Sequence, residues 1–159
     1  MKLIFALFAS FFMFFQNTDL ETIRTKYSAA HLNKQNAEAF SKLVKNGGST
    51  STIDAYKAAA KIVQAKFAVG EGRKKLITEG AKSLENIVKS DANNLEIRVI
   101  RMSLQESLPK FIKYNSNLAT DKTFILKNFA SQNTGLKAYI KKFAAQSKTF
   151  TAADRALLK

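Results

Sequence analysis

The stretch that decides the fold is LEIRVIRMSLQESLPKFIKY, residues 95–114. An α-helix turns by about 100° per residue, so positions three and four apart share a face. One apolar face of this helix is formed by Ile97, Ile100, Leu104 and Leu108, and the opposite one by Leu95, Val99 and Met102. A helix with two opposite apolar faces is normally packed between neighbours. The pattern therefore predicts a central helix in an all-α protein.

The two polar edges of this helix carry different chemistry. One edge presents Arg98, Arg101 and Gln105, and the other presents Glu96, Ser103 and Ser107. Two interpretations of the arginine edge stay open. The arginines can pair with carboxylates or carbonyls of adjacent helices, or Arg98, Arg101 and Gln105 can line a groove that clamps an anion or a peptide carboxylate.

The only proline of the chain, Pro109, sets the end of the central helix. Proline lacks a backbone N–H and clashes with the carbonyl four residues earlier. We expect the helix to end there and a short helix, capped by Ser107, to restart through FIKY.

The rest of the chain also shows helical periodicity, and no segment alternates as a strand does. The residues after position 17 predict six to eight helices, packed as antiparallel hairpins in a single domain at 18–159. GGSTS at 47–51 is the clearest linker, and we expect Ser51 or Thr52 to cap the helix that follows it. We interpret GEG at 70–72 as a break between two helices.

The N-terminus is typical of a signal peptide. Lys2 precedes an uncharged apolar run from Leu3 to Phe15, which is short for a bilayer span but suits the apolar core of a secretory signal. We predict a signal peptide at 1–17, without a defined cleavage point, and hence a periplasmic or secreted protein. An uncleaved anchor and a buried N-terminal helix are the alternatives.

The charge indicates which partners the protein attracts. The formal net charge is +14, and the chain has no cysteine. Such a charge attracts polyanions, although dispersed lysine is also the ordinary composition of solvated helix faces. The lack of cysteine excludes disulfides, thiolate metal sites and cysteine nucleophiles.

The sequence presents no constellation for catalysis. His31 is the only histidine, and no metal-ligand spacing, phosphate-binding loop or nucleophile motif is present. We therefore predict a non-enzymatic protein without a metal or small-molecule cofactor. It would bind an unknown protein partner in the cell envelope. The alternatives are a basic adaptor for anionic membrane surfaces or nucleic acid, and a small hydrolase that would need a cleft joining His31 to a serine and a carboxylate.

Two resemblances support this expectation. Residues 80–94, GAKSLENIVKSDANN, resemble the second helix and exit turn of a tetratricopeptide repeat, with Ala92 in place of the usual proline. A wider block resembles a family of small exported helical proteins of Bacteroidetes-type bacteria. The matching positions are Asn94, Glu96, Ile97, Arg98, Arg101, Pro109, Phe111, Tyr114, Asp121, Lys122, Phe124 and Ile125; Leu95 departs from the family's usual Ala or Val. The resemblance implies export and a helical fold, and it brings no catalytic residue.

Overall fold

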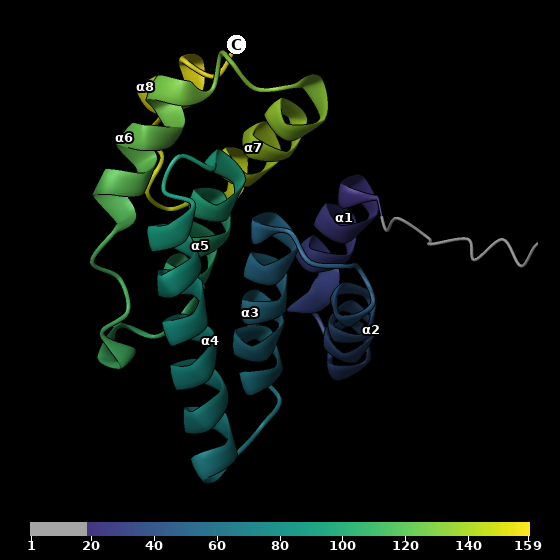
Figure 1. Cartoon of the computed structure of the whole chain (residues 1–159). Coiled ribbons are helices and arrows are strands. Elements are labelled where there is room, and N and C mark those ends of the chain that lie inside the picture. The colour runs from purple at the N-terminus through teal and green to yellow at the C-terminus, as the bar shows by residue number, and fades with distance from the viewer. Residues whose placement is uncertain (1–18) are drawn as a thin grey trace, which may run out of the picture.

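The computed structural model describes residues 19–159 and shows an all-α fold within them (Figure 1). The predicted signal peptide at 1–17 lies outside the described residues. Eight α-helices and one short 3₁₀ helix follow one another, and this part of the chain forms no strand. Their bounds are α1 Leu20–Ala30, α2 Lys34–Lys45, α3 Ser51–Ala65, α4 Gly70–Ser90, α5 Leu95–Ser107, η1 Lys110–Ile112, α6 Leu118–Asn128, α7 Thr134–Gln146 and α8 Ala152–Ala156.

The central position of α5 is confirmed. Its Ile97, Ile100 and Leu104 pack into a hydrophobic cluster with α1–α4. Its opposite face, Leu95, Val99 and Met102, packs into a second cluster with side chains of α6, α7 and the C-terminal segment. Figure 1 shows α5 between the C-terminal helices at the top and the N-terminal helices toward the right. One helix therefore joins the two halves of the core.

Helices α3 and α4 pack against each other, and Gly80 allows their close approach. A Cβ atom at Gly80 would lie 2.6 Å from a side-chain carbon of Ile62 and 2.9 Å from the carbonyl oxygen of Ala58. Glycine is used where the backbone of a neighbouring element comes this near. The small residue in the pattern at 80–94 thus has a direct packing role.

The helix boundaries correct two sequence predictions. Thr50, rather than Ser51 or Thr52, caps α3 by accepting a hydrogen bond from the Ile53 N–H at 3.2 Å. The break between α3 and α4 falls at residues 66–69, so GEG forms the first turn of α4. Gly70 has a φ of 57°, which explains a glycine there.

The helix restart at Pro109 is confirmed, but its predicted cap is wrong. Helix α5 ends at Ser107, and η1 begins immediately after Pro109. The Ser107 hydroxyl donates back to the Leu104 carbonyl at 2.9 Å and caps nothing ahead of it. None of the helices in residues 19–159 is long and apolar enough to cross a membrane.

Candidate functional site

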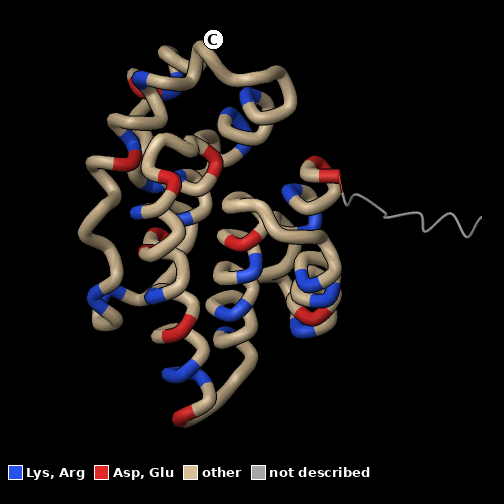
Figure 2. The backbone as a smooth tube through the Cα atoms, viewed as in Figure 1, with Lys and Arg blue, Asp and Glu red and all other residues tan. Residues whose placement is uncertain are grey.

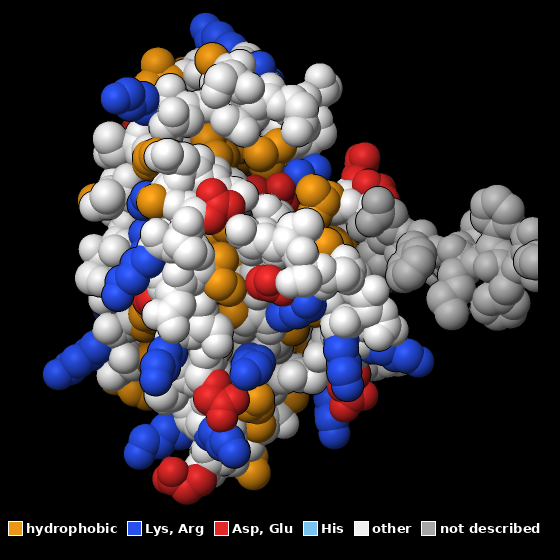
Figure 3. All heavy atoms as spheres, in the orientation of Figure 1, with side chains coloured by type: hydrophobic (Ala, Val, Ile, Leu, Met, Phe, Trp, Pro, Cys, Tyr) orange, Lys and Arg blue, Asp and Glu red, His pale blue; other side chains and the backbone are white. Residues whose placement is uncertain are grey.

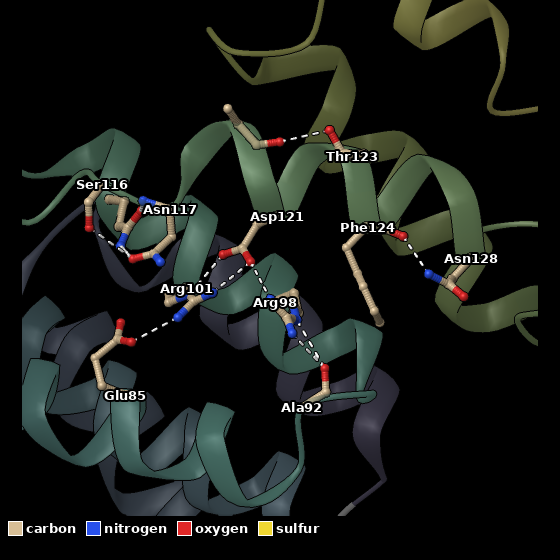
Figure 4. Close-up of polar contacts among 12 residues, drawn as sticks. Glu85, Ala92, Arg98, Arg101, Ser116, Asn117, Asp121, Thr123, Phe124 and Asn128 are labelled. Atoms are coloured by element: carbon tan, nitrogen blue, oxygen red, sulfur yellow. Dashed lines mark hydrogen bonds and ion pairs between the residues drawn. The ribbon is translucent and has the colours of Figure 1, made fainter.

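Arg101 lies at the centre of the polar contacts on the predicted edge of α5 (Figure 4). Its Nε and Nη2 donate to the two carboxylate oxygens of Asp121 on α6, at 2.8 and 2.7 Å. Its Nη1 donates to Glu85 of α4 at 2.8 Å. Burial lowers the pKa of Arg101, but hydrogen bonding and attraction to Asp121 and Glu85 outweigh it and raise this pKa. The guanidinium therefore ties α5 to two other helices.

Arg98, one turn before Arg101 on α5, binds the same carboxylate of Asp121. Its Nη1 donates to Asp121 at 3.0 Å, and its Nε and Nη2 donate to the carbonyl oxygen of Ala92 at 3.1 and 2.7 Å. The guanidinium carbon lies 4.5 Å from the centre of the Phe124 ring, within the range of a cation–π contact. Arg98 thus holds the α4–α5 turn and the start of α6 together.

Gln105, the third predicted site residue, makes a reciprocal amide contact. Its side-chain nitrogen donates to the Asn117 side-chain oxygen at 3.0 Å, and its oxygen accepts from the Asn117 N–H at 3.2 Å. This contact anchors the residue that precedes α6. The structure brings Arg98, Arg101 and Gln105 to one edge, as predicted, and each is hydrogen-bonded to a neighbouring segment. An external anion there would have to displace these partners.

The opposite edge of α5 carries a second buried network. Glu96 accepts from Arg24 of α1 through both oxygens, at 2.8 and 2.6 Å, and from the Tyr56 hydroxyl of α3 at 2.7 Å. The hydrogen bond to Glu96 raises the pKa of Arg24. Further along α5, Ser103 and the Tyr27 hydroxyl of α1 are 2.7 Å apart. Helix α5 is therefore fastened along both polar edges as well as both apolar faces.

The remaining arginines are also tied to the fold. Arg73 donates to the carbonyls of Ala65, Ala68 and Lys66 at the end of α3. Arg155 donates to the carbonyls of Ala144 and Ser147 at the end of α7. Because Arg24, Arg98 and Arg101 are paired as well, every arginine of the chain has a structural contact. Arg73 and Arg155 nevertheless stay exposed, so the exposed positive charge of the protein is mostly, but not entirely, lysine.

A groove of about 410 Å³ lies between α1, α5 and α7. Its apolar lining comes from Tyr27, Val63, Leu104, Tyr139 and Phe143. His31, Lys142 and Lys148 contribute basic side chains, and all three are exposed. The guanidinium carbon of Arg24 lies 5.8 Å from the centre of the Tyr139 ring, so α1 and α7 approach each other beside the groove.

The groove also gathers the residue types that a hydrolase would need. His31 shares it with Ser28, Ser103, Ser107, Ser147 and Glu106. Ser28, Ser103 and Ser107 donate to carbonyls of their own helices, at 2.8 to 2.9 Å. Ser147 donates to Glu106 at 2.5 Å. Within residues 19–159, no hydrogen bond joins the His31 side chain to any serine, so the geometry lacks the nucleophile–base contact of a catalytic triad.

Sequence reasoning missed the acidic partners. Glu85 and Glu106 each stand four residues before a lysine, which is the spacing of an ordinary helix-surface pair. In the structure, Glu85 instead binds Arg101 and Tyr114, and Glu106 binds Ser147 and the Thr149 N–H. Asp121 is fully buried, which its place in the first turn of a helix did not indicate. One signal was available in the sequence. Arginines on a helix that is packed between neighbours need acidic partners, so some of the acidic residues had to be buried as well.

The chemistry of a metal site is missing from residues 19–159, which contain no cluster of three or more histidine, cysteine or acidic side chains suited to a metal ion. Comparisons with protein-family models, curated proteins and solved structures found no match to this chain.

Proposed function

We propose that this chain is an exported, non-enzymatic helical protein that binds another macromolecule in the cell envelope. The observation that supports this most is that arginine and lysine differ in where they lie in the fold. Arg24, Arg98 and Arg101 form ion pairs inside the fold, whereas most of the exposed positive charge is lysine. Figure 2 shows lysine and arginine positions throughout residues 19–159 and fewer acidic ones. A surface of this kind attracts negatively charged partners.

Export is part of the proposal and rests on the sequence of the N-terminus. A basic residue, an uncharged apolar run and a polar segment follow one another within residues 2–19. The tetratricopeptide-like character of residues 80–94 also belongs to the proposal and is supported by the packing of Gly80 against α3. Fractionation of the native host tests export. The full chain should be found outside the cytoplasm, and a chain that begins at residue 18 should remain inside.

An affinity purification from the native envelope tests for a protein partner. It should be washed at an ionic strength of about 1 M, where the Debye length falls to about 3 Å and attraction to exposed lysines is screened. We expect the same partner to be recovered in replicate experiments. If nothing reproducible is recovered after this wash, a specific protein partner is contradicted.

A second candidate function, a basic adaptor for anionic envelope surfaces, has an observation of its own. Residues 122–153 contain lysines but no acidic residue. Lys137 and Lys141 lie on one face of α7, with their ammonium groups 5.8 and 5.9 Å from the centre of the Phe129 ring. By contrast, Figure 3 shows basic and acidic side chains interspersed over the lower half of the face in view, where α2, α3 and α4 lie. The α6–α7 side is therefore the best place to test.

The adaptor function is tested by sedimentation with vesicles that contain anionic lipid. We expect binding that weakens as salt rises and that falls in a Lys127→Gln/Lys137→Gln/Lys141→Gln variant. A control variant with the same charge change, Lys26→Gln/Lys42→Gln/Lys45→Gln, removes exposed lysines of α1 and α2. The control should keep most of the binding. No vesicle binding at low salt removes this candidate, and binding to DNA alone would replace it with the nucleic-acid alternative.

A further inference from the structure

The groove between α1, α5 and α7 has the size of a small-molecule site. Its volume of about 410 Å³ lies within the range of roughly 300–1,000 Å³ that is usual for ligand pockets. A stable interface with a folded partner buries on the order of 800 Å² per side and would extend well beyond this groove. The groove therefore fits a compact ligand better than a macromolecule, and such a ligand is separate from the macromolecular partner of the proposed function.

The floor of the groove is apolar although hydroxyl groups line it. The Tyr27 hydroxyl is held by Ser103 at 2.7 Å, so this tyrosine offers its ring. Ser103 and Ser107 donate to carbonyls of α5 at 2.8 and 2.9 Å. With these donors engaged, the accessible apolar floor comes chiefly from the partly exposed Val63, Tyr139 and Phe143. Such a lining favours the hydrocarbon part of a ligand.

The charged groups at the groove are mostly positive. Lys142 and Lys148 are exposed, and neither forms an ion pair in the described part of the chain. The one carboxylate in the lining, Glu106, is engaged through an oxygen that accepts from Ser147 and from the Thr149 N–H at 3.1 Å. His31 adds an imidazole from the end of α1. Lysine ammonium groups with no carboxylate partner favour an anionic group on the ligand.

We propose that this groove binds a fatty-acid-like anion, with its acyl chain on the floor of Val63, Tyr139 and Phe143 and its carboxylate at Lys142 and Lys148. The apolar floor sets the nature of the chain, and the two lysines set the sign of the headgroup. The site is separate from the Lys137 and Lys141 face that is proposed to contact anionic surfaces. The two proposals can therefore fail independently.

The test is a fluorescence titration of the full-length protein with a dansyl-labelled undecanoate, followed by displacement with dodecanoate below its micelle concentration. Dodecyltrimethylammonium, with the same chain and the opposite charge, is the ligand control. We expect dodecanoate to displace the probe and the cationic amphiphile to fail. Equal displacement by both, or by neither, overturns the proposal.

Two sets of variants locate the binding. Lys142→Ala/Lys148→Ala should weaken dodecanoate binding by about tenfold or more, because charge-assisted contacts are lost. The matched control, Lys137→Ala/Lys141→Ala on the helix that carries Lys142, should leave it within about twofold. Equal weakening by both pairs assigns the binding to general surface charge and overturns the proposal.

Ser107→Trp should fill the groove from the α5 side, since Ser107 is exposed and its hydroxyl contacts only its own helix. It also introduces the only tryptophan of the chain, whose fluorescence reports the local fold. Loss of dodecanoate binding in a folded Ser107→Trp protein supports the site, and unchanged affinity overturns it. If this variant does not fold, Gln146→Trp from the exposed α7 wall makes the same test.

Discussion

Asp121 of α6 accepts hydrogen bonds from Arg101 of α5 through both carboxylate oxygens, at 2.7 and 2.8 Å, and both side chains are buried. Arg98 reaches the same carboxylate at 3.0 Å. Asp121 is thus the point where the C-terminal helices are fastened to the central one. A paired group at such a position contributes little beyond a well-packed apolar pair, but its loss leaves a charge buried without a partner.

The first prediction concerns Asp121 itself. Asp121→Asn keeps the size of the side chain and removes its charge, which leaves two guanidinium groups short of a carboxylate. We expect the free energy of unfolding to fall by about 3–5 kcal/mol, measured by urea denaturation. The control is Asp54→Asn, which breaks a half-exposed pair with Lys57 on α3. It should cost at most about 1 kcal/mol, and a similar loss in both variants would contradict the assigned role of Asp121.

The second prediction concerns Glu96 on the other edge of α5. Glu96→Gln removes the charge opposite Arg24, and Tyr56→Phe removes only the 2.7 Å hydrogen bond. We expect a loss of about 3–5 kcal/mol for the first, from the unpaired buried charge, and of about 1–3 kcal/mol for the second. The double variant should lose less than the sum of the two, because the residues share one network. Strict additivity would show that the contact does not couple them.

The third prediction is unfolding at alkaline pH. Burial raises the pKa of Tyr27 to about 12, and it also raises the pKa values of Tyr56, Tyr114 and Tyr139. These are all the tyrosines of the chain. In the unfolded chain they ionise at about pH 10. Above that pH the unfolded state has lost protons that the folded state keeps, so the free energy of unfolding falls as pH rises.

The measurement is a parallel titration of tyrosinate absorbance and helical circular dichroism. The chain has no tryptophan, so the absorbance change belongs to tyrosine alone. We expect little tyrosinate at pH 10, followed by a steep rise that coincides with loss of helix. Full ionisation at about pH 10 with the helices intact would contradict the burial of these side chains.

The fourth prediction separates two glycines of α4. Gly80→Ala places a methyl group 2.6 Å from Ile62 and 2.9 Å from a backbone oxygen of α3. We expect a net loss of about 1–3 kcal/mol in the free energy of unfolding, because helix propensity gains less than overpacking costs. Gly72→Ala, with open space around its Cβ position, should instead stabilise by up to about 1 kcal/mol. Stabilisation by both would mean that α3 and α4 are not this close.

The arrangement around α5 could be predicted from residues 95–108 because it depends on helical periodicity alone. The two apolar faces indicated that α5 lies between two groups of neighbouring helices. The same helical spacing placed Arg98, Arg101 and Gln105 on one edge. Pro109 indicated the helix end through its missing N–H. These are local properties that hold for any surroundings of the helix.

The partners of those edges could not be predicted because they come from distant segments. Asp121 and Glu85 stand 20 and 16 positions from Arg101, and Arg24 stands 72 positions from Glu96. Helical spacing assigns an acid to a face but not to a neighbour. Thr50 was missed as a cap because four Ser or Thr residues in a row, at 49–52, all suit that position. The groove at α1, α5 and α7 depends on how three separate helices meet.

The measurement that tests the central claim most directly is the free energy of unfolding of Arg98→Met/Arg101→Met. If these arginines hold α5 to its neighbours and the lysines carry the outward charge, stability should fall by about 3 kcal/mol or more, because Asp121 stays buried without a partner. The protein that remains folded should bind anionic vesicles almost as wild type does. Stability within about 0.5 kcal/mol of wild type, together with lost vesicle or partner binding, would contradict the account and make the arginines a ligand site.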